Sequence, residues 1–402
     1  MRARIVRVFA VAGLCAAALP ASAFEAPPRF DVTKIPGLRA AGVNYTVANP
    51  VTSDGFLRVY QLKTSYGDVV ANGDAVLQMR LIELAAVAEL DKVNNSDAFN
   101  RALAEAGLRP IKFAGELIVN PVKTIGNTLA GIGSVFGQIG AGMNNAGKTV
   151  DDPMAGLLGV NKQRREIAAK LGVDPYTDFQ PLAVKLARLS EAAAAGGLVV
   201  NGALMAIPGV AGIVISNVST GYDLTSISRD YTAAQLMDMT RQKLTAMGVT
   251  RELSDAFLAN RNYTPLDAYA VGEALTAIQA RERPGFVARA AAVARRDAAF
   301  FMRRHVEMLA QYERKTGNVV AFLALGEFPF VELKSGTIMG LWPVDALSWT
   351  ESTGKALGAV NADLKRQGLA GKGELRISGT ATAMARENMK AMGWKLVENA
   401  RP

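Results

Sequence analysis

The sequence predicts an α+β protein that is mainly helical, with a small α/β domain at its C-terminus. Three observations support this prediction. β-like alternation comes before residue 74, helix-like periodicity and capping residues dominate from there to residue 315, and strand-like and helix-like segments alternate after it. We therefore expect residues 45–315 to form a mainly helical domain that opens with a β-hairpin, and residues 316–402 to form the small α/β domain.

The N-terminus has the pattern of a secretory signal peptide over residues 1–23. Three arginines precede a short apolar run, and Ala21-Ser22-Ala23 supplies the small residues that signal peptidase requires, so we expect cleavage before Phe24. The organisation of this segment is typical of a bacterial exported protein. Residues 24–44 are rich in proline and lack periodicity, and they are predicted to form a mobile lead-in.

The first structured region is predicted over residues 45–70 as β structure. Leu57 and Val59 alternate with polar residues after an Asp54-Gly55 turn, which indicates a strand that is buried on one face. A helix is expected over residues 74–93, followed by a short helix over residues 96–107. On the first helix we expect an apolar buried face and a charged face in water, made respectively of Leu77, Leu81, Leu84 and Ala88, and of Arg80, Glu83 and Glu89.

Two central segments, residues 124–147 and 192–222, carry no charge and are rich in glycine and alanine. So much apolar surface must be covered by a protein core, a membrane or a partner. We expect short packed apolar helices, because asparagines interrupt the first segment and Pro208-Gly209 interrupts the second. Membrane contact without complete crossing is compatible with this interpretation.

Further helices are expected over residues 162–171, from Pro181 onward, over residues 232–248 with a capping box, and from Thr264 to about Arg281. A long helix is then predicted over residues 285–313. Its apolar positions recur every three or four residues, which is typical of a packed helix. These positions are Val287, Ala291, Ala294, Ala298, Phe301, His305, Met308 and Tyr312.

The C-terminal region alternates between strand-like and helix-like segments. Strands are expected over residues 319–325, 330–333 and 337–342, followed by a helix over residues 352–366. A strand over residues 374–377, a helix over 381–392 and a strand over 394–397 then form a unit typical of a parallel pair with a right-handed crossover. All three tryptophans of the chain fall after residue 340, which suggests a separate core.

The residue composition excludes several kinds of chemistry. Cys15 is the only cysteine and lies in the predicted signal peptide, so we expect no disulfide, no cysteine-bound metal and no thiol nucleophile. His305 is the only histidine, and its place on an apolar stripe favours a buried, hydrogen-bonded side chain. Residues 142–149 match the phosphate-binding loop formula, but Asp151-Asp152-Pro153 opposes helix continuation, so we interpret the match as chance. No metal site and no cofactor is expected.

One turn is a candidate anion site. Ser378, Gly379, Thr380 and Thr382 lie between a predicted strand and a predicted helix, where backbone N–H groups and hydroxyls can hold an anion. Ordinary capping of the helix by Thr380 or Thr382 explains the same residues.

A second candidate is a basic face on the predicted helix over residues 285–313. Arg289, Arg296 and Arg303 are spaced by seven residues and would align on one face, which could bind anionic lipid headgroups. A solvated outer face explains the same spacing. Few aromatic residues interleave with these arginines, so no nucleic-acid partner is expected.

These observations favour a non-catalytic, exported protein of the periplasm or cell envelope. It would associate with membrane lipid or an envelope protein through residues 124–147 and 192–222. The alternative is a soluble periplasmic ligand-binding protein with its anion site at the turn in the C-terminal domain. A third and less favoured interpretation is a hydrolase whose catalytic residues carry no recognisable pattern.

Overall fold

The computed structural model describes residues 24–94, 101, 162–194, 223–326 and 328–400. Within these residues it contains eleven α-helices and three β-sheets, so the predicted α+β class with a helical majority is confirmed. The predictions on residues 1–23, 96–107, 124–147 and 142–149, and on most of residues 192–222, lie outside the described residues. Among the described helices, none combines the length and the apolarity that crossing a bilayer requires.

The N-terminal region forms an antiparallel five-stranded sheet, where the sequence predicted a hairpin. Its strands are β1 (Ala41–Gly42), β2 (Tyr45–Val47), β3 (Thr52–Ser53), β4 (Arg58–Thr64) and β5 (Gly67–Asn72). Strand β5 pairs only with β4 and forms one edge of the sheet. The predicted Asp54-Gly55 turn lies between β3 and β4, where the Asp54 carboxylate accepts the N–H groups of Phe56 and Leu57.

Residues 24–44, predicted to be a mobile lead-in, make specific contacts with the N-terminal sheet. Phe30 and Val51 exchange two backbone hydrogen bonds of 2.8 and 2.9 Å, and a short 3-10 helix follows (η1, Val32–Lys34). Val32 and Ile35 are buried in the same core cluster as residues of the N-terminal sheet and the helix that follows it. Apolar contacts of this kind hold a proline-rich segment in place without any helical or strand periodicity.

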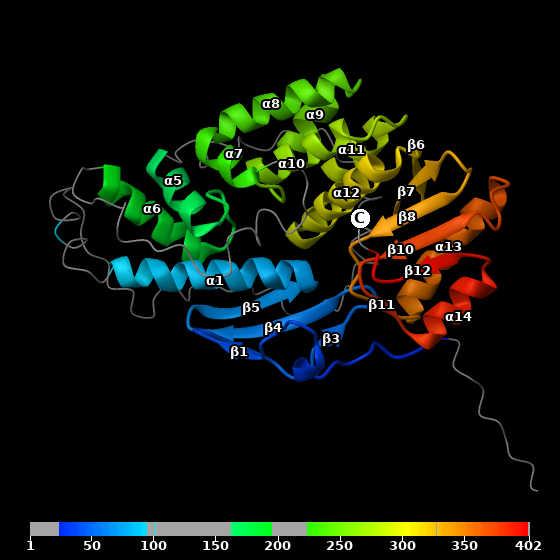
Figure 1. Cartoon of the computed structure of the whole chain (residues 1–402), viewed down its shortest axis with the longest axis horizontal. Helices are drawn as coiled ribbons and strands as arrows, with labels where there is room; N and C mark the ends of the chain where they lie inside the picture. The colour runs from blue at the N-terminus through cyan, green and yellow to red at the C-terminus, as the bar shows by residue number, and fades with distance from the viewer. Residues whose placement is uncertain (1–23, 95–100, 102–161, 195–222, 327, 401–402) are drawn as a thin grey trace, which may run out of the picture.

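Helix α1 (Asp74–Asn94) lies over the N-terminal sheet, and α5 (Lys162–Leu171) and α6 (Gln180–Ala194) lie beside it (Figure 1). Arg80, near the start of α1, pairs with Asp178, which lies two residues before α6. Asp91, near the end of α1, pairs with Lys185 in α6. These two ion pairs show that α1 and α6 run in the same direction, so both helices end at the same end of the fold.

A bundle of helices follows and lies above α1 and to the right of α6 in Figure 1. It consists of α7 (Leu224–Asp230), α8 (Ala233–Ala246), α9 (Arg251–Leu258), α10 (Pro265–Thr276), α11 (Arg283–Ala291) and α12 (Arg296–Thr316). The predicted capping box at the start of α8 is formed by Thr232 and Gln235. At the start of α10, Thr264 and Asp267 form a second capping box, with Pro265 in the first turn.

The prediction of one long helix over residues 285–313 is wrong, because α11 and α12 are separate. The side-chain amide of Asn260 donates to the carbonyl oxygens of Ala291 and Val293 at 3.0 and 2.8 Å. The amide of Asn262 adds a third bond to the Val293 carbonyl. These bonds satisfy carbonyl groups at the end of α11 that a continuing helix would use itself.

The C-terminal sheet has the strand order β12-β10-β8-β7-β6. Its elements agree closely with the predicted ones: β6 (Val319–Leu325), β7 (Phe328–Leu333), β8 (Ile338–Trp342), α13 (Glu351–Arg366), β10 (Gly373–Ile377), α14 (Ala383–Ala391) and β12 (Lys395–Val397). Strands β10 and β12, which precede and follow α14 in the sequence, pair in parallel, as predicted. Two further short strands, β9 (Ala346–Leu347) and β11 (Thr380–Ala381), pair in parallel beside this sheet.

The C-terminal sheet does not have the separate core that the sequence suggested. Its buried residues form one continuous cluster with those of α8 to α12, and Phe56 and Leu57 of the N-terminal region join the same cluster. A second cluster lies between the N-terminal sheet, α1, α5 and α6, and it includes Phe300 of α12. Because Phe301 belongs to the first cluster and Phe300 to the second, α12 connects the two cores.

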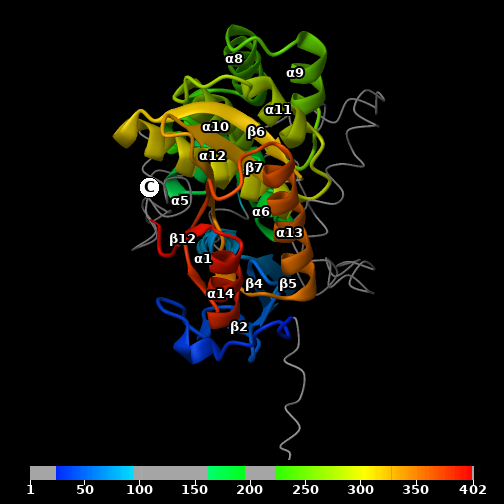
Figure 2. The same cartoon turned by 90° about the vertical axis from the view of Figure 1, so that its right-hand side faces the viewer.

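The two ends of the described chain are joined directly, and Figure 2 shows α14 at the level of β4 and β5 of the N-terminal sheet. The N–H of Glu25 donates to the carbonyl of Trp349 at 2.9 Å, and the Glu25 carboxylate accepts the N–H of Trp349 and the hydroxyl of Thr382. The buried Asp345 carboxylate accepts the N–H groups of Arg58 and Asp74 at 3.2 and 2.9 Å. One side chain after β8 therefore holds both β4 and the first turn of α1.

Candidate functional site

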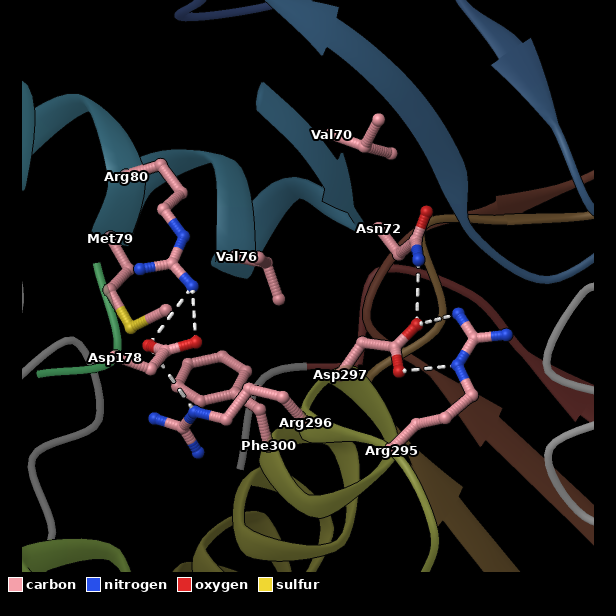
Figure 3. A pocket seen from close by; sticks show the side chains of 10 residues that line it. All are labelled: Val70, Asn72, Val76, Met79, Arg80, Asp178, Arg295, Arg296, Asp297 and Phe300. Atoms are coloured by element: carbon pink, nitrogen blue, oxygen red, sulfur yellow. Dashed lines mark hydrogen bonds and ion pairs between the residues drawn. The ribbon is translucent and has the colours of Figure 1, made fainter. Parts of the chain in front are cut away.

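A pocket of about 300 Å³ lies where β5, α1, the loop before α6 and the start of α12 meet (Figure 3). Its apolar lining comes from Val70, Val76, Met79 and Phe300. Its polar lining comes from Asn72, Arg80, Asp178, Arg295, Arg296 and Asp297. The pocket is therefore built by four segments that are distant in the sequence, and it lies between the two cores that α12 connects.

The polar residues form two groups on opposite sides of the pocket, with Val76 and Phe300 between them (Figure 3). On one side, Nη2 of Arg80 donates to both carboxylate oxygens of Asp178, at 2.9 and 3.0 Å. Oδ1 of Asp178 also lies 3.6 Å from Nε of Arg296. On the other side, Asp297 accepts Nε of Arg295 at 3.0 Å and Nδ2 of Asn72 at 2.6 Å. Each charged group thus already has a partner of opposite sign.

Asp267 is the centre of the ion pairs behind the pocket. Its carboxylate, almost fully buried, accepts Nη1 of Arg296 at 2.6 Å and Nη1 of Arg303 at 2.7 Å, and also the backbone N–H of Thr264. Arg303 continues through Nε to Glu307 at 2.8 Å. The starts of α10 and α12 are therefore held together by charge-assisted hydrogen bonds inside the protein.

The Arg80 side of the pocket extends inward in the same way. Arg80 and Glu83 are both buried and pair at 2.6 Å, and Glu83 also accepts the hydroxyl of Thr177. The prediction that Arg80 and Glu83 face water is wrong. Their partners Asp178 and Thr177 come from the loop before α6, and this loop lies over that face of α1.

Burial and neighbouring charges move the pKa values of these acids in opposite directions. Burial by itself would raise the pKa of Asp267, but Arg296 and Arg303 outweigh it and lower the pKa to about 2. Burial, together with the nearby Asp267 charge, raises the pKa of Asp174 to about 6. Burial also raises the pKa of Glu83, although Arg80 opposes the rise. Asp267 is therefore ionised at neutral pH, whereas burial opposes the ionisation of Asp174 and Glu83.

The structure does not bring the three predicted basic-face arginines onto one helix face. Arg289 lies on α11, where its Nη2 donates to the Gly326 carbonyl, whereas Arg296 and Arg303 lie on α12 and pair with Asp267. The prediction of a shared basic face is therefore wrong, and its physical reason is the break between the two helices. Arg296 nevertheless lines the pocket, next to Arg295.

The turn of residues 378–382 uses its donors internally. The N–H and hydroxyl groups of Ser378 and the N–H groups of Gly379, Thr380 and Thr382 all donate to backbone carbonyls of residues 342–347. Thr382 caps α14, and its hydroxyl donates to the Glu25 carboxylate. A Cβ on Gly379 would lie 1.8 Å from the carbonyl oxygen of Asp345, so the glycine permits a close backbone approach. The backbone donors of the predicted anion site are therefore used within the fold, and the Glu25 carboxylate lies beside Thr382.

His305 is buried, as predicted. Its Nδ1 lies 2.6 Å from the carbonyl oxygen of Leu341, and since a carbonyl can only accept, Nδ1 is the protonated nitrogen. Burial lowers the pKa of His305 to about 4, so the ring is neutral at neutral pH. Within the described part of the chain, no group of three or more His, Cys, Asp or Glu side chains is placed to hold a metal ion.

Comparisons with protein-family models, with curated proteins and with solved structures found no match to this chain. The pocket therefore has to be interpreted from its own geometry. Sequence reasoning missed four of its charged residues, Arg80, Asp178, Arg295 and Asp297. The only local signal was the group of seven arginines over residues 281–304. It suggested a basic helix surface, whereas two of these residues, Arg295 and Arg296, line the pocket.

Proposed function

We propose that this chain is an exported, non-catalytic protein of the cell envelope, which associates with membrane lipid or with an envelope protein. The attachment would use the two uncharged Gly/Ala-rich segments, residues 124–147 and 192–222. The predicted signal peptide over residues 1–23 supports export to the periplasm or envelope. The proposal assigns no substrate and no cofactor, and it expects no nucleic-acid partner.

One observation in the fold supports this proposal more than any other. Helices α1 and α6 run side by side in the same direction, and they end at Asn94 and Ala194, at one end of the fold (Figure 1). The connection that contains residues 124–147 follows α1, and the second segment begins in the last turn of α6. The connections over residues 95–161 and 195–222 therefore both leave the described fold at this end, which favours joint use of the apolar segments that they carry.

The other two interpretations have less support. The soluble ligand-binding alternative was based on an anion site at residues 378–382, and the donors of that turn are bonded internally. The hydrolase interpretation still has no residues assigned to it. The charged side chains of the pocket are held in ion pairs, and no nucleophile with an adjacent base is found among the residues that line it.

The proposal is tested with the mature chain, residues 24–402, in two binding assays at low and high salt. The first is flotation with liposomes of neutral and anionic composition, and the second is sedimentation with envelope fragments before and after protease treatment. Flotation that survives high salt identifies lipid as the partner. Binding only to untreated fragments identifies a protein. Failure to bind in both assays would overturn the proposal.

A variant pair distinguishes specific attachment from a change in net charge. Leu204→Lys combined with Ile213→Lys places two charges in the second apolar segment and should abolish the binding. Val43→Lys combined with Tyr231→Lys adds the same two charges at exposed positions of the described fold, 76% and 36% exposed, and should bind like the wild type. Equal binding by both double variants would refute the role of residues 192–222.

A further inference from the structure

We propose that α5, α6 and the loop between them form a pH-sensitive element, which is docked against the rest of the fold at mildly acidic pH and opens more often at neutral pH. The loop spans residues 172–179, and Asp174 within it is the group that responds to pH. In the sequence, the element lies between the connections over residues 95–161 and 195–222, so its opening would regulate the proposed attachment. That consequence rests on the proposed function, whereas the opening itself does not.

The first argument is the way in which the loop joins two cores. Val173 and Phe179 are buried in the cluster that contains residues of the N-terminal sheet and α1, whereas Tyr176 is buried in a third cluster with residues of α7, α8 and α10. Helix α5 adds one further bond, from Nε of Arg165 to the carbonyl of Arg229 at the end of α7. All these contacts are noncovalent, so the element can open locally while the neighbouring helices stay folded.

The second argument is the position of Asp174 beside another carboxylate. Both acids are bonded to Thr264: Asp174 accepts the threonine hydroxyl at 2.6 Å, and Asp267 accepts the backbone N–H at 2.9 Å. Asp267 has two arginine partners, Arg296 and Arg303. Asp174 makes no ion pair with any described residue. A second negative charge at this position is therefore unfavourable, and protonation of Asp174 removes it.

The other charged groups around Asp174 do not remove this repulsion. Arg296 of α12 and Arg164 of α5 act on Asp174 without forming an ion pair with it, and Arg296 already pairs with Asp267 at 2.6 Å. On the α1 side of the loop, Glu83 accepts the hydroxyl of Thr177, and burial raises the pKa of Glu83 as well. The remaining titratable groups of the loop are Tyr176, whose N–H donates to Asp174, and Asp178, which pairs with Arg80.

The sign and size of the pH effect follow from the pKa of Asp174. Burial, together with the charge of Asp267, raises this pKa from 3.8 to about 6 in the docked state. The docked state therefore prefers the protonated acid, so the equilibrium constant for opening rises with pH and levels off above about pH 6. With an ordinary pKa in the open state, the expected rise between pH 5 and pH 7 is about tenfold.

The experiment uses the mature chain, residues 24–402, which contains no cysteine. Ser190→Cys places a thiol on α6 at a position that is 2% exposed, and Ser254→Cys places a thiol on α9 at a position that is 0% exposed. Reaction with dithiodipyridine is followed at pH 5 and pH 7, and each rate is divided by that of the urea-unfolded variant at the same pH to give the opening constant. We expect the Ser190→Cys opening constant to rise about tenfold between these pH values, and to exceed that of Ser254→Cys at pH 7.

Two variants made in the Ser190→Cys protein identify the responsive group. Asp174→Asn keeps the shape of the side chain and should remove most of the rise, and the remainder is assigned to Glu83. Asp178→Asn removes a charge from the same loop and serves as the matched control. Burial opposes the ionisation of Asp178, but Arg80 and Arg296 outweigh it and lower its pKa, so the rise between pH 5 and pH 7 should persist in this variant.

Three outcomes would overturn the proposal. Equal opening constants for Ser190→Cys and Ser254→Cys at pH 7 would show that both thiols react only through global unfolding. An opening constant that does not change between pH 5 and pH 7 would exclude a pH-sensitive element. An equal rise in the Asp174→Asn and Asp178→Asn proteins would show that Asp174 is not the responsive group.

Discussion

Asp174 and Asp267 provide a matched pair of substitutions with opposite expected effects. Both carboxylates are hydrogen-bonded to Thr264, Asp174 through the threonine hydroxyl at 2.6 Å and Asp267 through the backbone N–H at 2.9 Å. Replacement of either residue by asparagine keeps the shape and removes one charge. We expect Asp174→Asn to stabilise the protein at neutral pH and Asp267→Asn to destabilise it.

The size of the Asp174 effect follows from its pKa. A rise from 3.8 in the unfolded chain to about 6 in the folded protein costs about 3 kcal/mol once the pH is well above 6, because each unit is worth 1.36 kcal/mol. The folded state prefers the protonated acid, so stability falls as the pH rises from about 4 to about 6. The gain from Asp174→Asn should therefore be up to about 3 kcal/mol at neutral pH and about 1 kcal/mol near pH 4.5.

The Asp267 effect has the opposite sign. Lowering its pKa from 3.8 to about 2 corresponds to about 2 kcal/mol of stability, present above pH 4 and lost as the pH falls toward 2. Asp267→Asn also leaves Arg296 and Arg303 without their shared carboxylate, and breaking a buried pair costs about 3–5 kcal/mol. We expect a loss of about 3 kcal/mol, at the lower limit, because Asp178 and Glu307 remain as partners.

The assay is urea unfolding of the mature wild type and both variants, followed by tryptophan fluorescence and circular dichroism, at neutral pH and near pH 4.5. Coincident transitions from the two probes would justify a two-state analysis. Loss of a hydrogen bond does not depend on pH in this range, so the pH dependence isolates the charge. If both variants shift the free energy of unfolding in the same direction, or if the Asp174→Asn gain is equal at both pH values, the electrostatic reasoning is refuted.

Three further predictions concern other described residues. His305, the only histidine, should stay neutral until the pH approaches 4 because burial lowers its pKa, and a titration midpoint near 6.5 by NMR would contradict its burial. Asp345→Asn should change the free energy of unfolding by less than about 1 kcal/mol, because the amide oxygen still accepts the N–H groups of Arg58 and Asp74. Asp345→Ala leaves both N–H groups unpaired and should lower the free energy of unfolding, measured in urea, by about 2–4 kcal/mol. Thr232→Ala should lower the free energy of unfolding by about 1 kcal/mol, because the capping box of α8 is lost. Thr245→Ala, at an exposed position of the same helix, should leave the free energy of unfolding unchanged, and equal losses in urea unfolding would contradict the capping argument.

The elements that local sequence signals specify were predicted well. The capping residues Thr232 and Thr264 locate the starts of α8 and α10, and the C-terminal elements agree with prediction to within two residues at most boundaries. These signals act within one turn or one strand, so the sequence near each element is sufficient to specify it. The parallel pairing of β10 and β12 followed from the handedness of strand–helix–strand connections.

The errors come from contacts between distant segments. Nothing near residue 292 ends a helix, and the end of α11 depends on Asn260 and Asn262, about thirty residues earlier. Arg80 and Glu83 have the spacing of a surface ion pair, and only the loop that contains Asp178, 98 residues later, buries them. The pocket could not be predicted for the same reason, because its four segments meet only in the folded protein.

The bonds of Glu25 to Trp349 and Thr382 impose an order on biosynthesis. Residue 382 is translated 357 residues after residue 25, so at about 5–20 residues per second the N-terminal segment waits roughly 20–70 s for this partner. During that interval Glu25 lacks its two hydrogen-bond partners, Trp349 and Thr382. The contact between Glu25 and Thr382 can therefore form only after residue 382 has been made, and a chain that stops before residue 345 lacks the carboxylate that accepts the N–H groups of Arg58 and Asp74.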